Sequence, residues 1–107
     1  MPLIDIKYDD SKVEGDEILA LSETIQDIVS KVTGIEDVFA YANSSQIAIK
    51  IAPIEVFVQM TANKIADKEK LTEEIRSQLS EWKRSANFKH PINLTLMPMD
   101  WRVIIGI

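Results

Sequence analysis

The sequence predicts an α+β fold in which two helices pack on one face of a mixed four-stranded sheet. Three observations support this fold class. Residues 2–8 and 54–60 alternate apolar and polar side chains with the period of a strand, and an amphipathic stretch of helical period follows each of them. Pro2-Leu3-Ile4-Asp5 is also echoed by Pro53-Ile54-Glu55-Val56, which indicates two stacked βαβ units. Right-handed crossovers would make the strands that flank each helix parallel.

The first unit begins with a strand whose apolar face comprises Ile4, Ile6 and Tyr8. A polar turn over residues 9–15 follows it, and we expect a helix to start near Asp16, whose carboxylate can cap free backbone N–H groups. Gly34 should end this helix, because glycine adopts the left-handed conformation at the least cost. The apolar face of the helix comprises Ile18, Leu21, Ile25, Ile28, Val29 and Val32.

The middle of the chain contains several short strand patterns. Residues 37–42 are predicted to form a strand, residues 43–45 a turn, and residues 47–51 a further strand or hairpin arm. Pro53 should interrupt that arm, because proline has no N–H to give to a sheet. Residues 54–60 form the strongest strand pattern of the chain.

The second helix should start after Asp67, whose carboxylate can cap free backbone N–H groups. Its charged residues are interpreted as a solvated face rather than a binding patch. Its apolar stripe comprises Leu71, Ile75, Leu79, Trp82 and Ala86. A last strand over residues 92–96 should end at Pro98 and Asp100. The apolar tail, residues 103–107, would either cover the core of its own domain or pair with a neighbouring subunit, and we favour pairing.

Length and composition limit the classes of function. The 107 residues suffice for a single domain, 1–107, and 46% of them are hydrophobic. The net charge of -5 and the pI of about 4.8 argue against a general nucleic-acid binder, which needs a basic surface. The chain has no cysteine, which excludes disulfides and thiolate sites. It has no apolar run of membrane-spanning length and no signal-peptide pattern, so we expect a cytoplasmic protein without membrane contact.

Few residues suggest chemistry by themselves. If Met1 is removed, Pro2 becomes a secondary amine at the start of a rigid strand, although a proline there also fits a purely structural role. His90 is the only histidine, and we interpret it as a solvated loop residue. Trp101 is either cover for the core or the lid of a pocket. Three scattered glycines exclude a glycine-rich phosphate loop.

Three short motifs, taken in order, resemble the tautomerase superfamily, which includes 4-oxalocrotonate tautomerase and macrophage migration inhibitory factor. The first is the proline after Met1, which opens a short strand. Val32-Thr33-Gly34 is similar to the Thr-Gly that closes the first helix in the second of these families. Thr61-Ala62-Asn63-Lys64-Ile65-Ala66 is similar to its Ser-Ile-Gly-Lys-Ile-Gly loop. The likeness extends over nearly the whole chain, and we expect a bacterial branch of the superfamily.

The resemblance implies a homotrimer with active sites between neighbouring subunits. It also implies keto–enol tautomerisation of a small carbonyl acid, with Pro2 as the general base and with neither a cofactor nor a metal. An α-amino group titrates just above neutral pH, and burial in an apolar pocket lowers its pKa, because the charged form is disfavoured. The base would then act near neutral pH.

This chain departs from the family pattern where substrate would be held. Ile35 stands where the inhibitory-factor branch has a lysine after Thr-Gly, and Ala62 replaces the first isoleucine of the loop. The resemblance therefore implies no residue that would hold the anionic end of the substrate. By residue type and by location near strand ends, the candidates are Arg102, Trp101 and Lys64.

Two other functions fit the pattern. The chain would be a non-catalytic trimer or ligand-binding protein if it kept the fold after losing the substrate-holding cation. A ferredoxin-like regulatory domain has the same order of elements, βαββαβ, so the pattern alone does not distinguish it.

Overall fold

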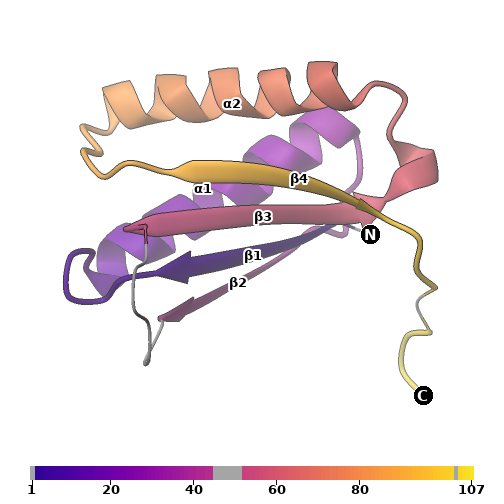
Figure 1. The fold of residues 1–107 in the computed structure, drawn as a ribbon, viewed down its shortest axis with the longest axis horizontal. Helices are drawn as coiled ribbons and strands as arrows, with labels where there is room; N and C mark the ends of the chain where they lie inside the picture. The colour runs from indigo at the N-terminus through magenta and orange to yellow at the C-terminus, as the bar shows by residue number, and fades with distance from the viewer. Residues whose placement is uncertain (1, 45–51, 103) are drawn as a thin grey trace.

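The computed structural model describes residues 2–44, 52–102 and 104–107. Within these ranges two helices lie on one side of a sheet of four strands (Figure 1). In chain order the elements are β1 (Leu3–Tyr8), α1 (Gly15–Thr33), β2 (Phe39–Ser44), β3 (Ile54–Thr61), the 3₁₀ turn η1 (Ala62–Lys64), α2 (Lys68–Ser85) and β4 (Asn93–Met99). The predicted hairpin arm over residues 47–51 lies outside the described residues.

The strands follow the order β2-β1-β3-β4. β1 and β2 are parallel, β3 and β4 are parallel, and β1 and β3 are antiparallel. Each helix thus connects two neighbouring parallel strands, which confirms the two stacked βαβ units. In a ferredoxin-like domain another strand separates the two strands that flank each helix. The ferredoxin-like alternative is therefore wrong.

The core lies between the sheet and the helices. Alternate residues of β1 and β3 point towards the helices, and Ile4, Ile6, Val56 and Val58 are completely buried there. The predicted apolar face of α1 packs on them, and α2 contributes Ile75 and Leu79. The side chains that the sequence pattern predicts to be apolar are the ones that are buried, because the layer between the sheet and the helices excludes water.

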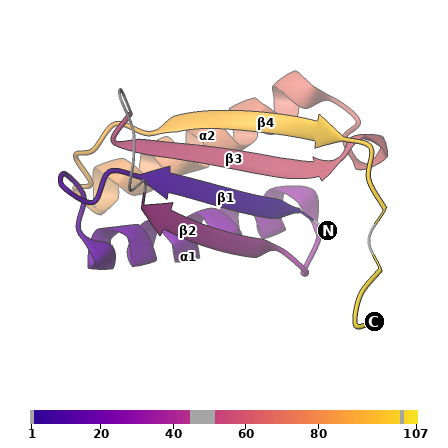
Figure 2. The ribbon, with the colours of Figure 1, turned by 60° about the horizontal axis from the view of Figure 1, so that its bottom comes forward.

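No helix of the described residues lies against the other face of the sheet, which we call the open face (Figure 2). Leu3 of β1 lies beside Phe39 of β2 in the register, and these two residues belong to this face. Phe39 is 43% exposed and Tyr41 on the same face is 54% exposed. Two large apolar side chains that are exposed next to each other on one face of a strand are unusual. At the other end of the strands Lys7 lies opposite Glu55, so the open face changes from apolar to polar along its length.

The helix α1 starts near Asp16 as predicted, but its cap residue differs from the prediction by two positions. The N-cap residue is Glu14, and the Glu17 side chain accepts the backbone N–H of Glu14 at 3.0 Å. Asp16 lies inside the first turn, where its carboxylate accepts the N–H of Glu17 at 3.0 Å. The prediction of Asp16 as the cap is wrong, because the helix already begins at Gly15.

Gly34 ends α1 as predicted, with a φ of 73° and its N–H donated to the carbonyl oxygen of Ser30 at 2.8 Å.

Gly34→Ala should lower the free energy of unfolding by about 1 kcal/mol, because an L side chain is strained at this φ. Urea denaturation measures the change. Gly15→Ala is the matched control, since Gly15 has open space and no positive φ, and this variant should be at least as stable as the wild type. Equal stability losses in both variants would contradict the strain argument.

The two edge strands differ from prediction at their ends. β2 begins two residues later than expected, at Phe39. β4 continues through Pro98 to Met99, so the prediction that Pro98 breaks the strand is wrong. β4 is an edge strand that pairs only with β3 in the described sheet, and proline is tolerated at an edge because no ladder bond is lost there.

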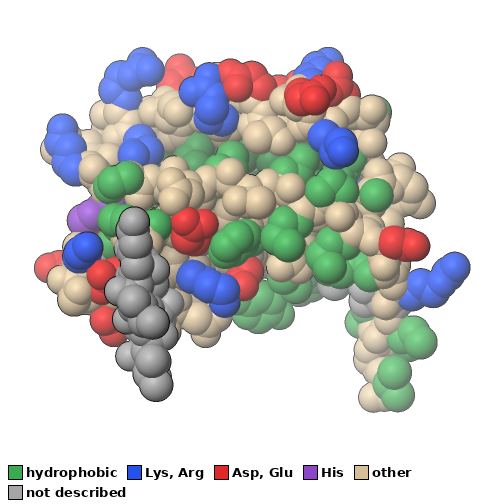
Figure 3. Space-filling view, viewed as in Figure 1, with side chains coloured by type: hydrophobic (Ala, Val, Ile, Leu, Met, Phe, Trp, Pro, Cys, Tyr) green, Lys and Arg blue, Asp and Glu red, His purple; other side chains and the backbone are tan. Residues whose placement is uncertain are grey.

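The second helix begins as predicted, with the Asp67 carboxylate accepting the backbone N–H of Lys70 at 3.1 Å. No helix in the described residues is long and apolar enough to cross a membrane. The tail beyond β4 extends away from the domain (Figure 3). Ile104 and Ile105 are 77% and 79% exposed, so this tail does not cover the core of its own domain.

Candidate functional site

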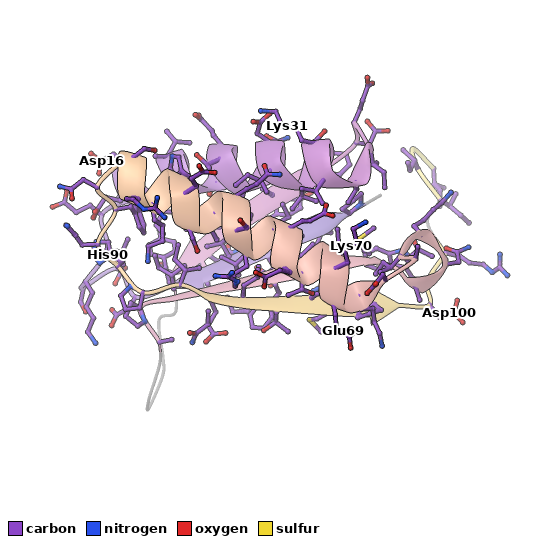
Figure 4. All side chains as sticks on the ribbon, turned by 90° about the horizontal axis from the view of Figure 1, so that it is seen from above. Asp16, Lys31, Glu69, Lys70, His90 and Asp100 are labelled. Carbon is purple, nitrogen blue, oxygen red and sulfur yellow. The ribbon has the colours of Figure 1, made fainter. Side chains whose placement is uncertain are left out.

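The residues predicted to act lie at one end of the sheet, which we call the proline end. β1 starts there, and β3 and β4 end there, because β1 is antiparallel to β3 and β3 is parallel to β4. The last turn of α1, the turn η1 and the first turn of α2 lie at the same end (Figure 1). Seen from above, Lys70, Glu69 and Asp100 mark this end, whereas Asp16 and His90 mark the opposite end (Figure 4).

Pro2 directly precedes β1 and is fixed by the sheet. Its carbonyl oxygen accepts the backbone N–H of Phe39 in β2 at 3.2 Å. Its side chain is less than 2% exposed. The strand alternation puts Pro2 on the same side as Ile4, towards the helices. The residue is therefore buried on the core side of the sheet, and its backbone is held by β2.

Lys64 ends the short turn that follows β3. Thr61, the last residue of β3, is also the N-cap residue of η1, and the N–H of Ile65 closes the turn on the carbonyl oxygen of Ala62 at 3.1 Å. The Lys64 side chain is exposed. Its backbone is thus held by one strand and one closed turn, while its ammonium group reaches solvent.

A groove of about 210 Å³ lies between the end of α1 and the start of α2. Its two lysines, Lys64 and Lys70, come from different elements, and Asp67 and Glu74 add two negative charges. Its apolar lining includes Val32 and Leu71. Pro2 does not belong to the lining of this groove, so Lys64 and Pro2 share an end of the sheet without sharing this cavity.

Trp101 lies just beyond β4 and makes one specific contact. Its indole Nε1–H donates to the hydroxyl oxygen of Thr61 at 2.8 Å, and the ring is half-buried. Arg102 follows and is exposed. The segment that carries both residues is therefore attached to the strand from which the turn with Lys64 starts.

Pro2, Lys64, Trp101 and Arg102 thus lie at the same end of the sheet, but no single described cavity is lined by all four. Their assigned roles stay predictions. Sequence reasoning missed Thr61, although this residue opens the motif that carries Lys64. Its partner is 40 residues away, and neither periodicity nor spacing indicates a contact over that separation.

His90 lies at the opposite end of the molecule and is not simply solvated. Its Nε2 lies 2.9 Å from Oε2 of Glu17 in α1, and its ring meets Phe88 edge-on at 5.4 Å. Nζ of Lys83 donates to the backbone oxygen of His90 at 2.7 Å. His90 therefore attaches the loop before β4 to both helices, which corrects the prediction of a solvated residue.

Glu17 gives this attachment a pH dependence. A hydrogen bond from the backbone N–H of Glu14 is the largest cause of a lowered pKa of the Glu17 carboxyl, and the His90 side chain lowers this pKa further. Because the pKa of Glu17 is lower in the folded than in the unfolded protein, its ionised carboxylate stabilises the fold at pH values above the ordinary pKa. This stabilisation is lost as the pH falls through the lowered, folded-state pKa. Urea midpoints measured from neutral pH down to about pH 3 should therefore fall less for Glu17→Gln than for the wild type. Glu23→Gln, at an exposed position of the same helix, should follow the wild type. Parallel curves for Glu17→Gln and the wild type would refute the role of Glu17.

Comparison with known proteins supports the fold assignment. No family model matches the chain, and no curated protein matches it. Among solved structures, wild-type fused 4-OT, an asymmetric trimer, is 12% identical with a TM-score of 0.68, over 94% of this chain and 91% of the other. Malonate semialdehyde decarboxylase is 11% identical with a TM-score of 0.66, over 98% and 92%. A macrophage migration inhibitory factor-like protein from Entamoeba histolytica is 16% identical with a TM-score of 0.59, over 96% and 95%.

These similarities cover almost all of each chain at very low identity. Such likeness establishes the fold and leaves the chemistry to be argued from the residues themselves. The chain has the α+β fold of the tautomerase superfamily, as the sequence resemblance implied.

Proposed function

We propose that this protein, which has the tautomerase-like fold, moves a proton between carbon and oxygen of a small keto or enol acid, with Pro2 as the general base. The observation behind this proposal is the position of Pro2. It is fixed by β2 at the end of the sheet where η1 and Trp101 also lie, and its ring is buried. Removal of Met1 would expose a secondary amine at this position.

The chemistry follows from the surroundings of that nitrogen. Apolar burial disfavours its protonated form and lowers its pKa, so that an uncharged base is present near neutral pH. The nitrogen takes the proton of the enol hydroxyl, and the carbonyl forms as the electron pair of the double bond moves to carbon. The protonated nitrogen then returns the proton to that carbon. Atoms and electrons balance, so the step is an isomerisation that needs no oxidant or reductant.

The substrate-holding residues are proposed from charge and location. Lys64 and Arg102 are exposed cations at the proline end, and either can bind a carboxylate. Trp101 offers a flat aromatic surface fixed through its N–H. Together they would supply what Ile35 does not, because this chain has no lysine after Gly34.

We further propose a homotrimer. The exposed Phe39 and Tyr41 give the open face an apolar region, and the apolar tail extends away from its own domain. Exposed apolar surface of this kind marks an interface between proteins. The fused 4-OT protein of the same fold is a trimer. In such an assembly, the open face would meet the other subunits and the tail would lie on a neighbour.

Proteins with this fold are described with more than one chemical reaction, so the fold does not specify the reaction. The semialdehyde decarboxylase of the same fold is described with decarboxylase and hydratase activities, and with a variant that has alanine for proline at its first position. A non-catalytic or ligand-binding trimer is the second candidate. Ile35 in place of the family's lysine favours it, as does the separation of Pro2 from the groove that contains Lys64.

The test begins with untagged protein. Intact mass spectrometry reports whether Met1 is removed, and ultraviolet absorbance follows the conversion of phenylenolpyruvate to its keto form. Loss of Met1 together with turnover supports the enzyme. A free Pro2 without turnover of any small enol acid would favour the non-catalytic candidate.

A further inference from the structure

The proposed substrate-holding residues belong to two separate segments of chain. Lys64 lies on the turn after β3, and Trp101 and Arg102 lie on the segment after β4. One side-chain hydrogen bond joins the two segments, from Nε1 of Trp101 to the hydroxyl oxygen of Thr61 at 2.8 Å.

Thr61 and Trp101 are held very differently. Thr61 pairs with Met99 in the β3–β4 register, so its backbone belongs to the sheet. It is also the N-cap residue of η1, and Lys64 follows it by three positions. Trp101 lies two residues beyond the last residue of β4, and within the part of the chain that the structure describes it pairs with no strand. The orientation of its ring therefore depends on side-chain contacts, of which the bond to Thr61 is directional.

We infer that Thr61 is a positioning residue of the proposed site, which fixes the indole of Trp101, and with it the segment that bears Arg102, against the turn that bears Lys64. This inference rests on the proposed function, because it concerns the same site. Thr61 itself need not touch the substrate. Its effect would pass through the ring that it orients, and small displacements of a substrate-positioning group have large effects on binding and rate.

The bond itself can be examined without any substrate. In a Trp82→Phe background, Trp101 is the only tryptophan, so the indole signal in NMR and fluorescence belongs to one residue. Thr61→Val keeps the branched shape and removes the acceptor, and Thr61→Ser keeps the hydroxyl. Thr61→Val should raise the rate of solvent exchange of the indole N–H about fivefold to tenfold. This is the factor by which the net free energy of one hydrogen bond changes an equilibrium constant. Thr61→Ser should stay near the wild-type rate.

A second readout connects the bond to ligand binding. Phenylpyruvate is the probe, and quenching of Trp101 fluorescence measures its Kd without turnover. Thr61→Val should weaken binding about tenfold, whereas Thr61→Ser should restore most of the affinity. Thr24→Val makes the same substitution on α1, in the helical layer on the other side of the sheet from the open face, and should leave both readouts unchanged.

The outcomes separate this inference from the proposed function. An unchanged indole signal in Thr61→Val would overturn the positioning role, and so would an altered signal with unchanged phenylpyruvate affinity. Full activity in a Pro2→Ala variant would instead refute the general base, while the Trp101 readouts would still decide the role of Thr61. Loss of affinity in Thr61→Val with rescue by Thr61→Ser supports the inference.

Discussion

Pro2→Ala should lower the turnover of a small enol acid by about 10²- to 10⁴-fold, the usual contribution of a general base. Alanine leaves a primary amine that can rotate about its backbone bond, whereas the ring of proline fixes the nitrogen in one direction. The amine that remains therefore spends less time in line with the substrate proton. The measurement is the initial rate with phenylenolpyruvate, for proteins whose loss of Met1 has been verified by intact mass.

The control for this variant is Pro91→Ala. Pro91 is exposed beside His90, at the end of the molecule opposite Pro2, so this variant should keep wild-type turnover. Circular dichroism and urea denaturation show whether Pro2→Ala stays folded, since the Pro2 ring is buried. A folded Pro2→Ala variant with undiminished turnover would remove Pro2 from the mechanism.

The second large effect concerns assembly. Phe39→Asp should convert the proposed trimer into monomers, so that the mass measured by light scattering falls to about one third. An aspartate at this position on the open face would be buried between subunits without a partner, which costs several kcal/mol for each charge. Phe39 is 43% exposed in the isolated chain, so the monomer itself should tolerate the change.

Leu19→Asp is the matched control for Phe39→Asp. Leu19 is 60% exposed on α1, in the helical layer on the other side of the sheet from the open face. This variant should keep the trimer. A wild-type protein that is monomeric at micromolar concentration would contradict the proposed assembly, and so would a Phe39→Asp variant that stays trimeric.

Local patterns predicted most of the fold. The alternation of Ile4 and Ile6, the helical spacing of the α1 stripe and the position of Gly34 each report on interactions within a few residues. Local patterns failed where contacts between distant parts of the chain decide the structure. β4 continues through Pro98 because it lies at the edge of the sheet, and the order of strands is not a local property.

The candidate site was predictable in part. Pro2 could be selected from a short motif and Lys64 from its residue type near a strand end, and both lie at the same end of the sheet. The contact between Thr61 and Trp101 and the pair of His90 with Glu17 could not, because these partners are 40 and 73 residues apart. The charge run of α2 was interpreted as a solvated face, which left Lys70 unnoticed as part of a groove.

By itself, the amino-acid sequence determined most of the segments that form strands and helices, and which of their faces are apolar. Those properties depend on neighbouring side chains and on the backbone, so short stretches are enough to specify them. Only the tertiary structure decided that Pro2, Lys64 and Trp101 share one end of the sheet, and that Thr61 joins two of their segments. The physical reason is that strand order and chain direction bring together residues whose separation along the chain contains no signal of contact.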